Sequence, residues 1–254
     1  MTIANLVIIT GASRGLGQAV AAQYLAEDAF VLGLSRRQSS ELEASGAGGL
    51  EQWPVDLAEP MPLVARLGAW LADFEQRAGG RLPARVRIIH NAAALSEPGD
   101  VAGSDPADLA RSLRIGIEAP VALTAAFLRA TANWRPSDRR VLFVSSGLGR
   151  RPMAGSAAYC AQKAGLDHFA RALALEEQGR PDGARVASVA PGIIDTDMQK
   201  QLREADPQRF AQQATFDEFH RSGALDSPAA AAAKLIALIE RDDFGAKPVT
   251  DVRE

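Results

Sequence analysis

Residues 6–17 read LVIITGASRGLG, an apolar run that passes directly into a glycine-rich turn. The run has the length and composition of a buried strand, and the Ala-rich residues after it have helical character. Glycines let a backbone turn tightly and approach a pyrophosphate closely, and a helix N-terminus offers it unpaired N–H groups. A tight turn without a ligand is the alternative, but the strand before it and the helix after it favour a dinucleotide site. The predicted contacts are Gly11, Ser13, Arg14, Gly15, Leu16 and Gly17.

Short apolar runs continue to alternate with longer helical stretches along the chain. Strand-length runs lie at 6–10, 30–34, 50–55, 86–90, 141–145 and 185–189, with a weaker one near 248–252 that Pro248 places at a sheet edge. Helical spacing of apolar residues covers 19–25, 63–74, 109–129, 157–175 and 229–239, with a bend expected near 116–120 because of Pro120. This order predicts one α/β domain over 1–254, a doubly wound parallel sheet of about seven strands with helices on both faces.

Residues 195–227 lack a strand and combine mixed charge with aromatic side chains. We expect a helical excursion there that could serve as a lid over a substrate.

Composition narrows the possible partners. The 254 residues carry a net charge of -3 without a basic stripe, so nucleic acid is not expected to bind. The single cysteine excludes an intramolecular disulfide, and the chain has neither a leader-like N-terminus nor an apolar run of membrane-spanning length. The three histidines show no metal-ligand spacing. We therefore expect a cytoplasmic protein with no metal site.

The end of the second strand indicates which dinucleotide binds. It reads Ser35, Arg36, Arg37, with no acid before Glu41. NAD sites commonly place an acid there for the ribose 2′-OH, whereas arginines favour the 2′-phosphate of NADP. Arg14 in the glycine turn adds a further positive charge that could reach this phosphate. The sequence thus favours NADP(H), unless Arg36 and Arg37 are simply solvated loop charges.

A candidate catalytic group lies in the second half of the chain. Tyr159 and Lys163 are four positions apart in a helical stretch, so they share one face. A nearby ammonium favours the phenolate and lowers the pKa of a tyrosine, which makes it a better acid or base. Ser146 follows a strand, and its hydroxyl can hold a carbonyl oxygen beside the tyrosine.

Five motifs together resemble the short-chain dehydrogenase/reductase family: TGASRGLG at 10–17, HNAA at 90–93, SSG at 145–147, Tyr159-x3-Lys163, and PGIIDT at 191–196. The resemblance spans nearly the whole chain. It implies a Rossmann-type domain, hydride transfer between a nicotinamide and a carbonyl carbon, and a homodimer or homotetramer. The cofactor contacts that it implies are Asp56 and Leu57 by the adenine, Asn91, Ala92 and Ala93 along the cofactor, Tyr159 and Lys163 at its nicotinamide end, and Pro191, Gly192, Ile194 and Thr196, the last two at the carboxamide.

The last third resembles more narrowly the sepiapterin reductases and microbial benzil reductases. The likeness rests on AYCA at 158–161, LALEE at 173–177 and APGIIDTDMQ at 190–199. It implies a small-molecule substrate with a ketone or vicinal diketone group. Candidate substrate contacts are Ser146, Leu148, Gln199 and Asp251, the last either as an anchor for a pterin or as an exposed C-terminal carboxylate.

Gly116 departs from the family pattern. Many members carry an asparagine there, which kinks the helix and helps to hold a water that links the lysine to solvent. We expect the helix still to bend and a backbone carbonyl to bind the water. Two other interpretations stay open: an NADP-binding sensor or scaffold with weak activity, and a reductase of another carbonyl class such as β-ketoacyl thioesters.

Overall fold

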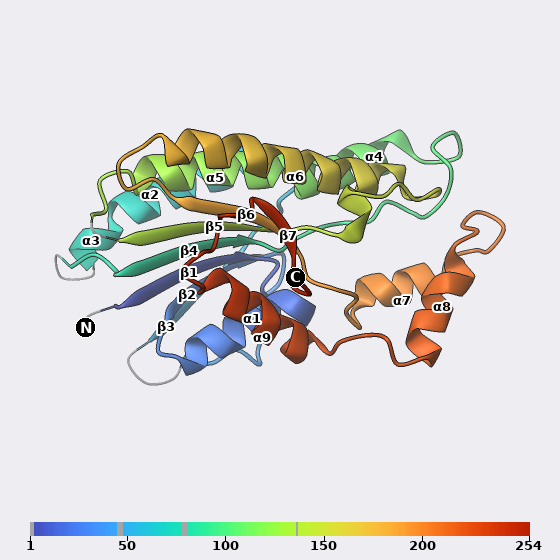
Figure 1. Ribbon diagram of the computed structural model, residues 1–254, viewed down its shortest axis with the longest axis horizontal. Helices are drawn as coiled ribbons and strands as arrows, with labels where there is room; N and C mark the ends of the chain where they lie inside the picture. The colour runs from blue at the N-terminus through green and yellow to red at the C-terminus, as the bar shows by residue number, and fades with distance from the viewer. Residues whose placement is uncertain (1–2, 45–47, 78–80, 136) are drawn as a thin grey trace.

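The computed structural model describes residues 3–44, 48–77, 81–135 and 137–254. Seven strands form one parallel sheet in the order β3-β2-β1-β4-β5-β6-β7 (Figure 1). The strands are β1 (Asn5–Thr10), β2 (Phe30–Ser35), β3 (Gly49–Pro54), β4 (Arg85–His90), β5 (Asp138–Val144), β6 (Arg185–Ala190) and β7 (Val249–Asp251). The predicted α/β fold is confirmed, including the edge position of the last strand.

Two layers of helices cover the two faces of the sheet (Figure 1). One layer contains α2 (Pro60–Ala72), α5 (Ala119–Ala130) and α6 (Ala157–Gln178), and the other contains α1 (Gly15–Ala26) and α9 (Pro228–Ile239). The short α3 (Phe74–Arg77) follows α2, and α4 (Pro106–Leu113) precedes the helix that leads into α5.

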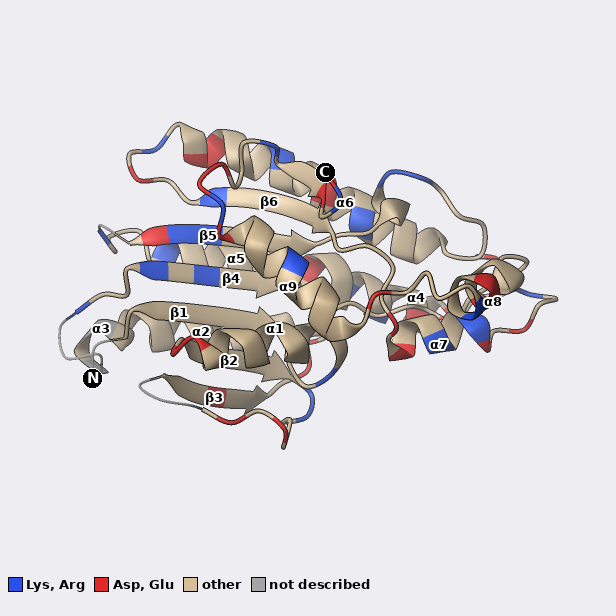
Figure 2. Cartoon of the chain, turned by 60° about the horizontal axis from the view of Figure 1, so that its bottom comes forward, with Lys and Arg blue, Asp and Glu red and all other residues tan. Residues whose placement is uncertain are grey.

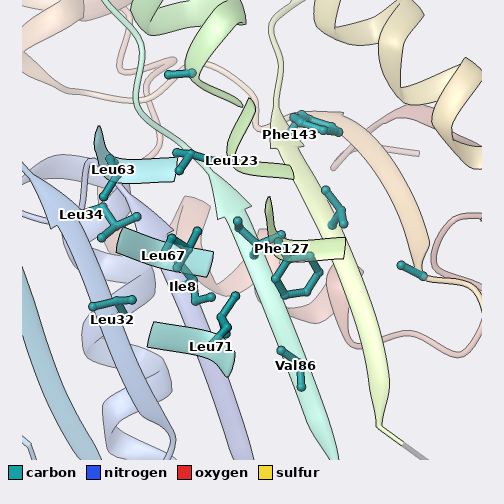
Figure 3. Close-up of a cluster of buried hydrophobic side chains, with 14 of the residues drawn as sticks. Ile8, Leu32, Leu34, Leu63, Leu67, Leu71, Val86, Leu123, Phe127 and Phe143 are labelled. Carbon is teal, nitrogen blue, oxygen red and sulfur yellow. The ribbon is translucent and has the colours of Figure 1, made fainter. Parts of the chain in front are cut away.

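The strands are apolar on both sides, and successive side chains enter opposite cores. Leu6 and Ile8 of β1 pack under α2 and α5, whereas Val7 and Ile9 pack against α1 and α9. Figure 3 shows the first core, where Leu63, Leu67 and Leu71 of α2 approach Ile8, Leu32 and Leu34 of the sheet. Burial on both faces explains why these strands show little polar alternation.

The helix expected over 109–129 is interrupted. Between α4 and α5 lies a π-helix, η1 (Arg114–Glu118), in which the Ala119 N–H reaches back five residues to the carbonyl oxygen of Arg114. Pro120 has no N–H, so the carbonyl of Gly116 cannot receive the usual α-helical hydrogen bond from residue 120. Where a bend was predicted near 116–120, the structure has a π-helix at 114–118.

The strand-free segment forms α7 (Asp197–Arg203) and α8 (Gln213–Arg221), which project from the body at the right of Figure 1. Their shared core is Leu202, Phe210 and Phe216. An isolated parallel bridge joins Ile194 to Asp226, so the segment leaves the domain and returns to it at the same point.

A cluster of buried charge lies at the other end of the sheet, where Figure 2 shows basic and acidic residues near the starts of β4, β5 and β6. The Arg87 side chain is 1% exposed. Its Nη2 donates to Asp138 Oδ2 and to Glu240 Oε2, both at 2.8 Å, and its Nε donates to Glu240 Oε1 at 3.0 Å. The Tyr24 hydroxyl donates to the same Glu240 oxygen at 2.9 Å. The cluster thus joins α1, β4, β5 and the end of α9.

Candidate active site

The predicted functional residues gather at one edge of the sheet. Because all strands are parallel, their carboxyl ends meet there, and the loops after β1, β4, β5 and β6 lie side by side. The chain order reverses between β1 and β4, which is where ligands bind in open α/β sheets. The glycine turn follows β1, Asn91 follows β4, and Ser146 follows β5.

The glycine turn needs glycine for two different reasons. Gly11 and Gly15 have φ values of 72° and 57°, in the left-handed region that side chains disfavour. Gly17 has no such φ, but a Cβ there would lie 2.2 Å from the carbonyl oxygen of Gly11 and 2.4 Å from Asn91 Nδ2. The first turn of α1 therefore packs against the loop with no room for a side chain.

The Asn91 side chain stabilises this turn through two hydrogen bonds. Its Nδ2 donates to the carbonyl oxygens of Thr10 and Gly11 at 3.1 and 3.2 Å. The backbone N–H of Ala92 donates to Thr10 Oγ1 at 3.1 Å. The structure therefore places Asn91 and Ala92 of the predicted 91–93 segment against the glycine turn, where Asn91 holds the turn in shape.

Gly17→Ala is expected to weaken dinucleotide binding at least about tenfold, because the new methyl group must displace the Gly11 carbonyl and distort the turn. Titration of protein fluorescence with NADPH and NADH would measure this loss. Gly68→Ala in α2 is the matched control, since a Cβ there meets nothing within 4 Å. Equal affinity in the two variants would contradict the assignment of this loop to the dinucleotide.

The end of β2 has the features of a nucleotide ribose site. Ser35 is buried, and no described residue hydrogen-bonds its Oγ, while Arg36 and Arg37 are both exposed beside it. Asp56 follows β3, and the Ala58 N–H together with Arg111 and Arg36 holds the pKa of its carboxyl below the usual value. Leu57 is buried next to it. A buried hydroxyl with no hydrogen-bond partner among the described residues, beside two exposed arginines and a glycine cradle, fits the ribose of a bound dinucleotide.

The segment after β6 closes over the glycine turn. Thr196 Cγ2 would lie 3.5 Å from a Cβ on Gly15, and Gly192 has a φ of 86°. Arg14 forms an ion pair with Asp197 at the start of α7. The structure thus brings Arg14 to the strand-free segment and leaves Arg36 and Arg37 as the basic residues after β2.

Ser146, Tyr159 and Lys163 come together at the end of β5. Ser146 precedes the 3-10 turn η2 (Gly147–Gly149), and its Oγ accepts a hydrogen bond from the Leu148 N–H at 3.2 Å. Burial raises the pKa of Tyr159 to about 12, while a hydrogen bond with Ser146 acts in the opposite direction. Lys163 Nζ lies 5.5 Å from the centroid of the Tyr159 ring and donates to the carbonyl oxygen of Val144 at 2.7 Å.

A buried carboxylate that the sequence reasoning did not identify lies one turn beyond Lys163. Burial lowers the pKa of Lys163 to about 8, and the charge of Asp167 opposes this shift. Asp167 Oδ1 accepts hydrogen bonds from Ser145 Oγ at 2.6 Å and Ser188 Oγ at 2.7 Å. Its position four residues after Lys163 was a usable signal, because it repeats the spacing from Tyr159 to Lys163.

The three candidate substrate contacts beyond Ser146 differ in their surroundings. Leu148 is half-buried in η2. Gln199 on α7 has a buried Oε1 with no hydrogen-bond partner among the described residues. Asp251 is buried on β7 and accepts from Arg253 Nε at 2.7 Å and Nη2 at 2.6 Å, so its carboxylate is already paired. Of these, Gln199 retains a free acceptor.

Within the described ranges, no group of three or more histidine, cysteine or acidic side chains is arranged to hold a metal ion. No helix in those ranges is both long and apolar enough to cross a membrane.

The sheet, the glycine turn and the Ser-Tyr-Lys group define a Rossmann-fold oxidoreductase. The chain belongs to the short chain dehydrogenase family, whose pattern matches residues 5–207. Members use nicotinamide cofactors, and the protein is an oxidoreductase that acts on CH-OH and C=O groups.

Its relatives include the two reductase groups that the last third of the sequence resembles. A benzil reductase ((S)-benzoin forming) of Bacillus cereus is 31% identical over 94% of this chain and 95% of its own. A sepiapterin reductase of Bos taurus is 32% identical over 94% of this chain and 91% of its own. A crystal structure of a short-chain dehydrogenase/reductase from Burkholderia vietnamiensis is 34% identical over 99% of both chains, with a TM-score of 0.64.

Proposed function

We propose that the protein is an NADPH-dependent carbonyl reductase whose substrate is a ketone or a vicinal diketone. The observation that carries this proposal is the convergence of Ser146, Tyr159 and Lys163 at the carboxyl edge of the sheet, next to the glycine turn. The benzil and sepiapterin reductases among the relatives support the substrate class.

The chain would hold the dinucleotide with residues that the geometry has already grouped. The turn at 11–17 and the N-terminus of α1 suit the pyrophosphate, and the Ser35 hydroxyl with Arg36 and Arg37 suits a ribose 2′-phosphate. Asp56 and Leu57, which follow β3, would contact the adenine. When bound, NADPH supplies the hydride that reduces the carbonyl carbon.

Three side chains would complete the reduction. The Ser146 hydroxyl donates to the carbonyl oxygen and fixes it beside Tyr159. With its pKa raised to about 12, the Tyr159 phenol is protonated at neutral pH and can give its proton to the same oxygen. The Lys163 ammonium, 5.5 Å from the centre of the ring, stabilises the phenolate that remains.

The segment with α7 and α8 would act as a lid over the substrate. It starts and ends at the Ile194–Asp226 bridge, and Arg14 ties its first helix to the dinucleotide loop through Asp197. Gln199 of this lid has a buried Oε1 without a partner among the described residues, and this oxygen would accept a hydrogen bond from an O–H or N–H group of a substrate. As in the family at large, we also expect a homodimer or homotetramer.

The purified protein can test this function directly. A panel of simple ketones, benzil, quinones, a β-ketoacyl thioester and sepiapterin would be assayed with NADPH and with NADH by the loss of reduced-cofactor absorbance. We expect turnover of the dicarbonyl compounds with NADPH. Tight NADPH binding without turnover of any substrate would instead indicate a sensor, and preference for the thioester would indicate a different carbonyl class.

Arg36→Asp is expected to shift the ratio of NADPH to NADH affinity at least about tenfold toward NADH, because it removes a charge-assisted contact to the 2′-phosphate and adds a like charge. Equilibrium titration with both dinucleotides would measure the ratio. Lys247→Asp makes the same charge change on an exposed side chain just before β7, at the amino-end edge of the sheet. An unchanged ratio in Arg36→Asp would show that this arginine does not contact the phosphate.

A further inference from the structure

Gln162 lies in the catalytic helix between Tyr159 and Lys163, and its side chain is fully buried. Its Nε2 donates to Ser112 Oγ and, at 3.1 Å, to the carbonyl oxygen of Ala94. The Ser112 hydroxyl donates to the same carbonyl at 2.9 Å. These bonds fix the carboxamide between α6, α4 and the loop after β4.

The carbonyl oxygen of this carboxamide lacks a hydrogen-bond partner in the described part of the chain. Gln162 Oε1 is buried, and no described residue donates a hydrogen bond to it. A buried acceptor without a donor costs about 1–3 kcal/mol, so native proteins commonly satisfy it with an ordered water. The oxygen therefore points to a bound water.

This oxygen lies against the π-helix η1. A Cβ on Gly116 would come within 1.8 Å of Gln162 Oε1 and 2.3 Å of its Cδ, so the carboxamide fills the space that a side chain at position 116 would occupy. The two residues form a matched pair, because a glutamine reaching from α6 needs a glycine on η1. The Gly116 carbonyl cannot accept the usual α-helical hydrogen bond from residue 120, because Pro120 has no N–H.

Lys163 follows Gln162 directly in α6, and its side chain is buried as well. Its ammonium has three N–H donors, one of which bonds to the Val144 carbonyl. When Tyr159 has given up its proton to the product oxygen, the proton that replaces it must come from solvent into a site that is almost fully buried. A water that bridges Gln162 Oε1 and the Lys163 amine would return a proton to the lysine and take one from solvent in exchange.

We propose that Gln162 is a positioning residue for proton resupply: its Oε1, together with the η1 backbone at Gly116, holds a buried water that serves Lys163. This inference rests on the proposed reductase function and adds to it. In this chain, Gln162 of α6 would supply the amide group that the family's asparagine supplies at position 116.

Gln162→Met tests the proposal, since methionine keeps the length of the side chain but cannot hold a water. We expect kcat with the best dicarbonyl substrate to fall about tenfold, with KM little changed and a larger solvent deuterium isotope effect on kcat. The fall in kcat/KM with rising pH, expected in the wild type near the Lys163 pKa of about 8, should move to a different pH. Leu166→Met, another buried and volume-conserving change on α6, should alter none of these quantities.

Moving the amide group from position 162 to position 116 should restore the activity that is lost when Gln162 is replaced. Gln162→Ala should lose activity as Gln162→Met does, and the double variant Gly116→Asn with Gln162→Ala should recover most of it, because an amide again fills the shared space. Gly116→Asn alone should be destabilised, since its Cβ overlaps the glutamine.

A high-resolution crystal structure tests the water without any turnover. Wild type should show a water about 2.7–3.2 Å from Gln162 Oε1, and Gln162→Met should lack it. Absence of this water in wild type, or unchanged kcat, isotope effect and pH profile in Gln162→Met, would overturn the proposal. Failure of wild type to reduce any carbonyl would reject the proposed function instead, and the water would still be decided by the crystal structure.

Discussion

Tyr159→Phe is expected to lower kcat for benzil about a thousandfold and to leave the NADPH dissociation constant nearly unchanged. The substitution removes the hydroxyl that donates the proton to the carbonyl oxygen, and general acid catalysis contributes about 10²–10⁴ to rates. The ring itself stays, so the packing of α6 against the cofactor edge is preserved. Steady-state kinetics and fluorescence titration with NADPH would measure the two quantities.

The chain contains its own control for this experiment. Tyr24 is the only other tyrosine, is buried like Tyr159, and donates its hydroxyl to Glu240 far from Ser146. Tyr24→Phe should cost about 1 kcal/mol of stability and keep the full kcat. If Tyr159→Phe keeps its turnover too, the assignment of Tyr159 as proton donor is wrong.

Arg87→Ala is expected to lower the free energy of unfolding by about 3 kcal/mol, because it removes the buried guanidinium that is the main partner of Glu240 and one of three arginines that bond Asp138, both carboxylates being half-buried. Arg87 bonds Asp138 and Glu240 at 2.8 Å and is itself 1% exposed. Burial raises the pKa of both carboxyls, but their hydrogen bonds to arginines dominate and hold each pKa below its usual value. Urea unfolding followed by circular dichroism would measure the loss.

The pH dependence of this loss has a defined sign. Carboxyls with a lowered folded-state pKa stabilise the fold above their unfolded pKa and lose that contribution as pH falls through the folded value. The gap between wild type and Arg87→Ala should therefore narrow below about pH 4.

Arg241→Ala is the matched control for Arg87→Ala. Arg241 pairs with Asp243 on the surface, with its side chain 56% exposed, and solvent screening leaves such pairs with little effect on stability. A similar small loss in both variants would show that water replaces the Arg87 guanidinium without penalty.

Much of the fold was predictable because its signals are local. The apolar run at 6–10 and the glycines at 11, 15 and 17 define a strand, turn and helix without reference to the rest of the chain. The spacing of Tyr159 and Lys163 on one helical face is equally local, as is the irregularity at Pro120. Each depends on backbone geometry over a few residues.

The partners of these residues were not predictable, because they depend on contacts between distant segments. Asn91 could be assigned to the cofactor by resemblance, but only the packed loops show that it braces the Gly11 turn. Arg14 could be expected near a 2′-phosphate, yet the fold brings it to Asp197. Asp251 is an exception, because its partner Arg253 lies only two positions away in the chain.

By itself, the sequence determined the parallel α/β architecture, the dinucleotide turn and the Ser146, Tyr159 and Lys163 group, since apolar periodicity, glycine and helical spacing act over short distances. Only the tertiary structure showed which side chain fills the space beside Gly116, where many family members carry an asparagine. The Gln162 carboxamide occupies that space from another helix, 46 positions along the chain by the difference of 162 and 116. Such an exchange depends on close packing between helices, which no pattern within either helix records.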